Sequence, residues 1–275
     1  MLGKLIKHEL RATAAPMLLL SLGVLGVSVL TRLCMLLAEI WDFFALFASL
    51  AMTAYVIGAA AAYIFVFVMI VRRFYTNIYG AEGYLTLMLP VKRWKLLLAK
   101  LLAAILWMVV SAAVIFVSVL ILASYPDLLR QVWDGFGYFG SMFTQVVRSL
   151  GMPGWLLILE LVLIIVIGLF QSVLMLYASV SIGQLFRRHR FFGSVAGYLM
   201  IYAACQILMG LWTVMAGFTA EGIFETASRY TGAVTGLGAF QLQVVAVTYI
   251  LILALITLAC YLITHTVMKR AVNLQ

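Results

Sequence analysis

The stretch RRFYTNIYGAEGYLTLMLPVKRWKLLLAK, residues 72–100, is the main indicator of how this chain is arranged in a membrane. It holds six basic residues and one acidic residue, and long apolar runs lie on both sides of it. Basic residues in short loops stay on the cytoplasmic side of a membrane. The loop 72–95 is therefore predicted to connect two membrane spans on the cytoplasmic side. Its centre, residues 84–89, is too apolar for a plain solvated loop, which indicates that it docks onto something in the cytoplasm.

The composition of the whole chain excludes an ordinary soluble protein. Hydrophobic residues make up 66% of its 275 residues and charged residues 10%, whereas globular domains have about 25% charged residues. Several apolar runs exceed the ~20 residues that a helix needs to cross the hydrocarbon core. The alternating strands of about ten residues that are typical of a membrane β-barrel are not visible. The expected fold is an all-α integral membrane protein with a single transmembrane domain, 1–275.

Six apolar runs define the predicted spans, which are approximately 16–37, 47–71, 96–123, 155–185, 192–216 and 241–267. Residues 1–15 place Glu9 and several leucines on one helical stripe, and they are expected to form an amphipathic helix in the membrane interface. Pro16 is expected to begin the first span, where its missing N–H costs little. The small residues Ala54, Gly58 and Ala62 allow another helix to approach closely, in the same chain or in a second copy.

The charges support this topology with both termini in the cytoplasm. Of the 18 Lys and Arg residues, 14 fall on the predicted cytoplasmic side, and six of the nine acidic residues fall outside. The net charge of +9 is therefore explained by membrane orientation, and no nucleic-acid partner is expected. Segments 124–154 and 217–240 are then external. The first is expected to contain a short helix between turns, and the second to dip into the outer leaflet and return.

The sequence supplies no pattern that favours catalysis in this chain. It has no GxxxxGK[ST] nucleotide-binding loop. Its three histidines lie in separate segments without HExxH spacing, and its three cysteines have no paired spacing, so neither a metal site nor a disulfide framework is expected. We therefore predict no catalytic residue, no cofactor and no metal ligand.

Glu160 is the one acidic residue inside a predicted span. An intramembrane carboxylate is costly and often functional, so Glu160 either reaches water near the outer headgroups or faces a cavity that takes cargo. Gln171, Tyr177 and Gln206 are further polar side chains in the spans. Each of them either holds helices together or belongs to the same candidate cargo path.

Residues 79–89 are expected to form a short cytoplasmic helix, because Pro90 disfavours helical backbone at the residue before it and Glu82 suits the positive end of a helix dipole. The apolar side chains of such a helix would fit a groove on a partner. The alternative is that the segment packs on its own protein. The predicted contact residues are Tyr79, Gly80, Glu82, Gly83, Tyr84, Leu85, Met88, Leu89 and Pro90.

The run Gly80-Ala-Glu-Gly-Tyr-Leu-Thr-Leu-Met-Leu-Pro-Val-Lys-Arg, followed by Leu96-Leu-Leu-Ala-Lys-Leu-Leu, resembles a motif of one transporter family. It is similar to the permease subunits of type-2 bacterial ATP-binding-cassette (ABC) exporters of the Firmicutes type. Ala81, Met88 and Lys92 stand where that motif usually has Asp, Thr and Ser, and these departures affect the details of docking.

The resemblance implies that residues 79–90 act as a coupling helix in a groove of a separately encoded ATPase. Two permeases, identical or homologous, would work with two ATPase subunits that bind ATP and Mg. The second cytoplasmic loop would make a smaller contact through Gln184, Arg187, Arg188 and Arg190. Residues 1–15 resemble the connecting helix of this class and residues 217–240 its external segment. The implied location is the bacterial plasma membrane.

We therefore expect a permease subunit that moves an amphipathic or hydrophobic cargo outward, such as a peptide, drug or lipid, with ATP hydrolysed by the partner. The alternative is an ion-coupled secondary transporter or channel that acts without an ATPase. That alternative requires several cavity-facing acids or broken helices, and the spans contain only Glu160. The identity of the cargo, of the second permease and the direction of transport stay open.

Overall fold

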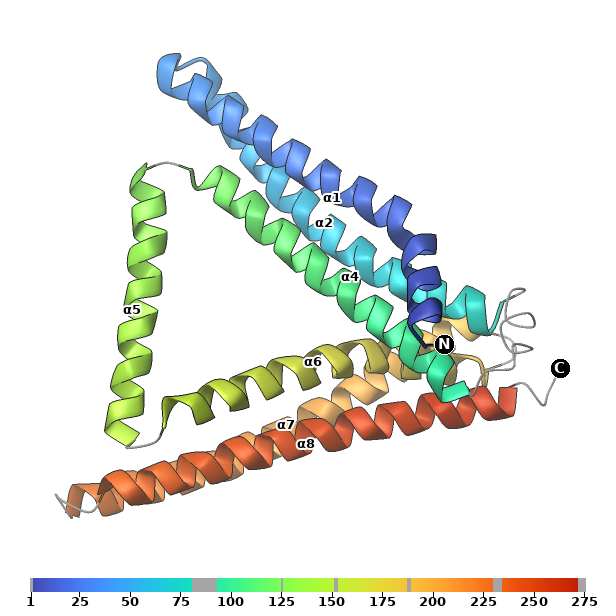
Figure 1. Ribbon diagram of the computed structural model, residues 1–275, viewed down its shortest axis with the longest axis vertical. Coiled ribbons are helices and arrows are strands. Elements are labelled where there is room, and N and C mark those ends of the chain that lie inside the picture. Colours follow the sequence, from blue (N-terminus) through green and yellow to red (C-terminus); the bar gives the residue numbers. More distant parts are fainter. Residues whose placement is uncertain are drawn as a thin grey trace. The chain divides into compact units, whose positions relative to one another are not determined.

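The computed structural model describes residues 2–80, 93–124, 126–150, 153–186, 189–229 and 234–271. The helices in these ranges are α1 (Leu2–Ile40), α2 (Phe44–Ile78), α4 (Arg93–Leu122), α5 (Pro126–Leu150), α6 (Gly154–Gly183), α7 (Arg190–Arg229) and α8 (Val234–Ala271) (Figure 1). Six of them, all except α5, contain a segment long and apolar enough to cross a membrane. The predicted all-α class with six spans is confirmed at this level.

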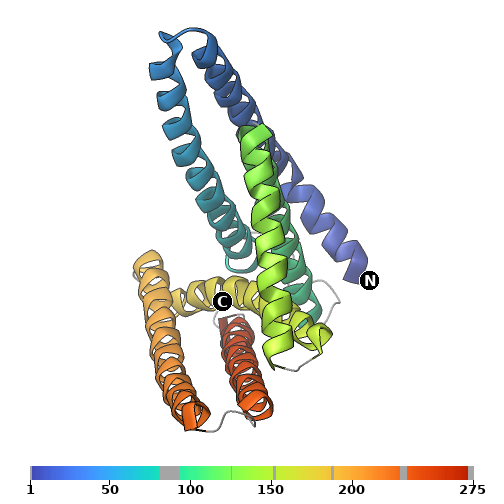
Figure 2. The same cartoon turned by 90° about the vertical axis from the view of Figure 1, so that its left-hand side faces the viewer.

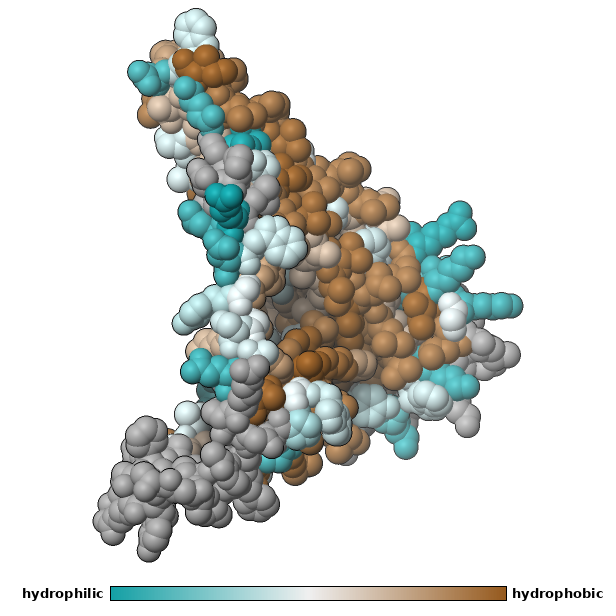
Figure 3. Space-filling model, turned by 60° about the vertical axis from the view of Figure 1, so that its left-hand side comes forward, coloured by the Kyte–Doolittle hydropathy of each residue, from teal (hydrophilic) through white to brown (hydrophobic). Residues whose placement is uncertain are grey.

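The surfaces of these helices are apolar where a soluble protein would be polar. Leu19 of α1 and Ile57 of α2 are 76% and 70% exposed, and many other large apolar side chains are exposed with them. Figure 3 shows apolar side chains covering much of the visible face. Contiguous apolar surface of this extent is not stable in water, and it fits contact with lipid acyl chains. The chain is accordingly a multi-pass membrane protein.

The chain divides into two compact units, Met1–Gly135 and Phe136–Gln275, within the predicted single domain. In unit 1, α1 packs against both α2 and α4, while α2 and α4 contact each other less. The direction of the helices follows from side-chain pairs. Three side-chain hydrogen bonds follow one another along α1 and α4: Glu9 with Lys100, Thr13 with Trp107, and Arg32 with Ser124 just after α4. Because the residue numbers rise together on both sides, α1 and α4 run parallel. A turn joins α1 to the antiparallel α2 (Figure 2).

Unit 2 repeats this packing pattern. Its first helix, α6, packs against both α7 and α8, while α7 and α8 contact each other less. The end of α6 meets the start of α7 around Gly183 and Ser194. Later in α7, Trp212 donates from Nε1 to Thr248 Oγ1 in the first half of α8, at 3.1 Å. The helices of this unit therefore also run up, down and up.

The N-terminal part of the chain differs from its prediction. Residues 2–40 form one helix with Pro16 inside it, so the expectation that Pro16 begins a helix was wrong. A proline in a helix interior removes one backbone hydrogen bond and bends the axis, and Figure 1 shows α1 bent near its N-terminal end. At 1.5 Å per residue this helix is about 58 Å long, well beyond the ~30 Å hydrocarbon core. An interfacial position for residues 1–15 stays a prediction.

The two external segments are also more helical than expected. Segment 124–154 is mostly the 25-residue helix α5, instead of a short helix between turns. Residues 217–229 continue α7 and residues 234–240 begin α8, so most of the segment expected to dip into the outer leaflet extends two spans. The remaining predicted spans overlap their helices: α2 is longer at both ends, whereas α4 and α6 begin earlier than expected and end earlier too, at Leu122 and Gly183.

Candidate functional site: an ionic cluster at the ends of α1, α2 and α4

Three helix ends of unit 1 meet around one carboxylate. Glu9 lies in the second turn of α1, Arg73 and Asn77 lie in the last turns of α2, and Lys100 lies in the second turn of α4. Because α2 ends at Ile78 and α4 begins at Arg93, these turns lie on either side of residues 81–92 in the sequence. We call Glu9, Arg73, Asn77 and Lys100 the ionic cluster.

The Glu9 carboxylate is shared among the other members of the ionic cluster. Lys100 Nζ lies 2.5 Å from Glu9 Oε1, and Arg73 Nε lies 3.3 Å from Glu9 Oε2. Asn77 donates from Nδ2 to Glu9 Oε1 at 3.5 Å. The Lys100 side chain is 3% exposed and that of Glu9 is 13% exposed. One carboxylate therefore binds both neighbouring helices, and does so largely out of contact with solvent.

The burial of Lys100 makes the ionic cluster hard to take apart. Moving an ammonium group out of water is expensive, and a buried pair repays this cost only with good geometry and further hydrogen bonds. Here Glu9 supplies the opposite charge to Lys100, and Arg73 and Asn77 fill further hydrogen-bonding positions of the same carboxylate. Separating α4 from α1 would leave Lys100 without this anion. The first turns of α1 and α4 and the last turns of α2 are thus held as one body.

A second pair of contacts lies next to the ionic cluster. Trp107 of α4 donates from its indole N–H to Thr13 Oγ1 at 2.8 Å. The Thr13 hydroxyl in turn donates to the carbonyl of Glu9 at 2.9 Å. Thr13 is 8% exposed, as is Trp107. This chain of hydrogen bonds ties α1 to α4 one turn beyond the Glu9–Lys100 pair.

Two of the predicted coupling residues lie within the described part of the chain. Tyr79 caps the C-terminal end of α2, its N–H donates to Tyr75 O at 2.8 Å, and its ring meets Phe74 edge-on. Gly80 donates its N–H to the same carbonyl at 2.9 Å. The other predicted coupling residues lie outside the described residues; they are Glu82, Gly83, Tyr84, Leu85, Met88, Leu89 and Pro90.

The predicted second cytoplasmic contact lies at the tight connection between α6 and α7. Gln184 caps α6, and Arg190 is the exposed first residue of α7. Arg187 and Arg188 lie outside the described residues. The helices approach closely here, because a Cβ on Gly183 would meet Ser194 Oγ at 1.9 Å.

The four residues of the candidate cargo path lie on two helices of unit 2. Glu160 is 7% exposed and accepts a hydrogen bond from Nε2 of Gln243 on α8. Tyr177 is 2% exposed, Gln171 is half-buried, and the exposed Gln206 bonds to Tyr202 on its own helix at 2.6 Å. The bonds of Glu160 and Gln206 that we describe thus lead away from the other candidates, and a shared cargo path stays a prediction.

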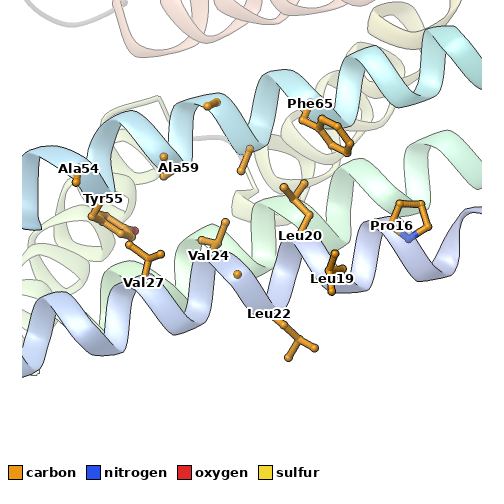
Figure 4. Close-up of a pocket in the computed structure, with 14 residues that line it drawn as sticks. Pro16, Leu19, Leu20, Leu22, Val24, Val27, Ala54, Tyr55, Ala59 and Phe65 are labelled. Atoms are coloured by element: carbon orange, nitrogen blue, oxygen red, sulfur yellow. The ribbon is translucent and has the colours of Figure 1, made fainter.

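Unit 1 carries an apolar groove between α1 and α2 with a volume of about 1000 Å³. It extends from Pro16 and Phe65 at one end to Val27 and Ala54 at the other (Figure 4). Gly58 also lines it, and a Cβ on Gly58 would meet nothing within 4 Å. Ala54 and Gly58 of the small-residue stripe are exposed toward this groove, whereas Ala62 is buried within unit 1.

Four members of these sites were not singled out from the sequence. Arg73 and Lys100 were counted only as cytoplasmic charges, although Glu9 lies on the apolar stripe of its helix, which is the usual sign of a buried partner. Asn77 and Gln243 were not noted; for Gln243, the available signal was its place at the polar start of the sixth apolar run. In the described ranges, no group of three His, Cys, Asp or Glu side chains is placed to hold a metal ion.

The chain was compared with family models, curated proteins and solved structures. None of them matches it.

Proposed function

We propose that this protein is the permease subunit of an ABC exporter, and that a separate ATPase drives it through residues 79–90. The proposal is supported by the resemblance of residues 80–102 and by six apolar helices with basic residues gathered on one predicted side. The chain itself contributes no covalent chemistry in this scheme. It binds cargo, couples to the ATPase and changes the side of the membrane to which cargo has access.

The ionic cluster is the observation that carries this proposal. Residues 81–92 connect α2 to α4, and both of these helices are bound to Glu9 of α1 through Arg73 and Lys100. A force applied to the connecting segment would therefore move the adjoining turns of three helices together instead of bending one of them. Such rigid-body movement of packed helices is the usual way in which an event at one site changes a distant one.

The proposed cycle is mechanical. ATP binding closes the ATPase pair and draws together the coupling segments of two permeases. The helices bound through Glu9 follow, and access changes from the inner to the outer side. An amphipathic or hydrophobic cargo suits this protein, since the described spans present mainly apolar side chains and an apolar groove.

Copurification tests the proposal. A tagged chain in its native membrane should retain an ATPase, identified by its nucleotide-binding loop and by ATP hydrolysis in the purified complex. The double variant Tyr84→Asp/Leu85→Asp should lose that subunit, because two charges would enter an apolar contact. The matched control is Tyr138→Asp/Phe139→Asp on α5, where both side chains are exposed.

Two outcomes would contradict the proposal. Retention of the ATPase by the Tyr84→Asp/Leu85→Asp variant would place the contact elsewhere. Transport by the purified chain alone in liposomes, driven by an ion gradient and without ATP, would favour the ion-coupled carrier.

A further inference from the structure

Unit 2 contains a buried carboxyl paired with an amide inside its spans. Glu160 lies in the second turn of α6 and is 7% exposed. Gln243 of α8 donates from Nε2 to Glu160 Oε1. Both residues lie in segments that are apolar enough to cross a membrane. Because hydrocarbon supplies no hydrogen bonds, the polar atoms of such a pair must satisfy one another.

An ionised carboxylate can form a hydrogen bond with the amide N–H of Gln243 but not with its amide oxygen. The Oε1 atom of Gln243 is buried and has no hydrogen-bond partner among the described residues. An ionised carboxylate has acceptors only, so it can receive the amide N–H but can give nothing to the amide oxygen. A neutral carboxylic acid carries one O–H donor beside its carbonyl oxygen, which matches the donor and acceptor of an amide one for one. Buried polar atoms are normally paired, and the neutral acid supplies the missing donor.

The surrounding charges also differ from those around Glu9. Glu9 has two cations, Lys100 and Arg73, against its carboxylate, whereas Glu160 has an amide. Glu160 is the one charged residue in the sequence of α6. The charged side chains described on α7 and α8 are Arg190 and Lys269, and each stands at the opposite end of its helix from this pair. The end of α5 also approaches the start of α6, with Val147 and Phe143 near Gly154, and the charged residue next to this contact is Arg148, whose side chain lies outside the described ones.

The other titratable side chains described on these helices are those of tyrosine, cysteine and histidine residues. The described ones are Tyr177 on α6, Tyr198, Tyr202 and Cys205 on α7, and Tyr249, Cys260, Tyr261 and His265 on α8. Three charged residues belong to the last turns of α7, whose side chains lie outside the described ones; they are Glu221, Glu225 and Arg229. Arg229 of α7 and Arg148 of α5 are thus the cations to be tested as competing partners.

We propose that Glu160 is a neutral carboxylic acid, joined to the Gln243 amide by two hydrogen bonds that lock α6 to α8 within the membrane. This inference does not depend on the proposed function. It changes the interpretation of Glu160, because a neutral carboxyl that is hydrogen-bonded to α8 does not offer a charge to cargo. These two hydrogen bonds break only when α6 and α8 move apart.

Infrared spectroscopy of the full-length chain in lipid bilayers tests the protonation directly. The difference spectrum between the wild type and Glu160→Gln should contain the C=O band of a protonated carboxylic acid, shifted when H₂O is replaced by D₂O. Glu221→Gln and Glu225→Gln are controls that should leave this band in place. A difference spectrum with carboxylate bands alone would overturn the proposal. So would an acid band that appears only after Arg229→Gln or Arg148→Gln, because Glu160 would then be ionised and paired with that arginine.

Thermal unfolding supplies a second test with a matched control in the same chain. Glu160→Gln keeps one donor and one acceptor for Gln243, so its Tm should equal that of the wild type, whereas Glu160→Leu and Gln243→Leu should lower it. Glu9→Gln removes the anion shared by Lys100 and Arg73, and its Tm should fall. An equal loss of Tm in Glu160→Gln and Glu9→Gln would show that Glu160 acts as a charge and would overturn the proposal.

Discussion

Lys100 Nζ on α4 lies 2.5 Å from Glu9 Oε1 on α1, although 91 positions separate the two residues in the sequence. Arg73 of α2 binds the second oxygen of the same carboxylate. The Glu9 carboxylate thus joins α1, α2 and α4, and the bound turns of α2 and α4 flank residues 81–92 in the sequence. The strength of the Glu9–Lys100 pair decides whether these helix ends move together.

Replacement of Lys100 tests this pair. Lys100→Met leaves Glu9 buried with one cation fewer, and removal of one partner from a buried pair costs about 3 kcal/mol or more. Lys95→Met is the matched control, because Lys95 is partly exposed and lies 5.5 Å from the Trp94 ring instead of against a carboxylate. Its effect should stay within about 1 kcal/mol. Unfolding of both variants in detergent measures the difference, and equal losses would show that the Glu9 pair adds no stability.

The indole of Trp107 should contribute through its N–H as well as through its bulk. Trp107→Phe removes the hydrogen bond to Thr13 Oγ1 and should lower the free energy of unfolding by about 1–2 kcal/mol. Trp94→Phe is the control, since Trp94 is 44% exposed. If the control loses as much stability, the Thr13 contact is not the cause.

Tyr55 and Ser118 should be energetically coupled. The Tyr55 hydroxyl lies 2.6 Å from Ser118 Oγ in a buried position between α2 and α4. In a double-mutant cycle with Tyr55→Phe and Ser118→Ala, the coupling energy should be about 0.5–1.5 kcal/mol. Additive losses would mean that this contact does not bind α2 to α4.

The connection between α6 and α7 should not accept a side chain at Gly183. A Cβ there would lie 2.7 Å from both Arg190 O and Ser194 N, in addition to the Ser194 hydroxyl. Gly183→Ala should therefore cost about 2 kcal/mol, and Ser194→Ala should not rescue it because the backbone atoms stay in place. Gly168→Ala in the same helix meets nothing within 4 Å and should be neutral or stabilising by up to about 1 kcal/mol. Circular dichroism melts compare them, and a harmless Gly183→Ala would show that the helices can separate here.

The orientation in the membrane is testable with single cysteines. In a background with Cys34, Cys205 and Cys260 replaced by Ala, Tyr138→Cys should react with a membrane-impermeant maleimide on intact cells. Lys4→Cys should react only after the membrane is opened. These outcomes follow from the distribution of basic residues. The reverse pattern of labelling would place the ionic cluster on the outer side and remove the basis for an ATPase contact.

The local pattern of apolar residues was sufficient to predict the helices, but it did not predict which side chains pair between them. Apolar runs of spanning length predicted the existence and order of six helices but not all of their ends, since α1 begins well before residue 16 and α7 extends well beyond residue 216. They also did not predict that helix would continue through Pro16 or that α5 would be 25 residues long. A proline in a helix interior kinks the helix or breaks it. In this chain the residues before Pro16 are held by Glu9 and Thr13.

The sequence by itself determined the membrane class, the number of apolar helices and the basic segment at residues 72–100, because hydrophobicity and charge act locally along the chain. Only the tertiary structure decided which polar groups meet. It joined Glu9 to Lys100, and Glu160 to Gln243, across 91 and 83 positions. Such pairs depend on the rotation and register of packed helices, and these are set by many weak contacts that no single stretch of sequence contains.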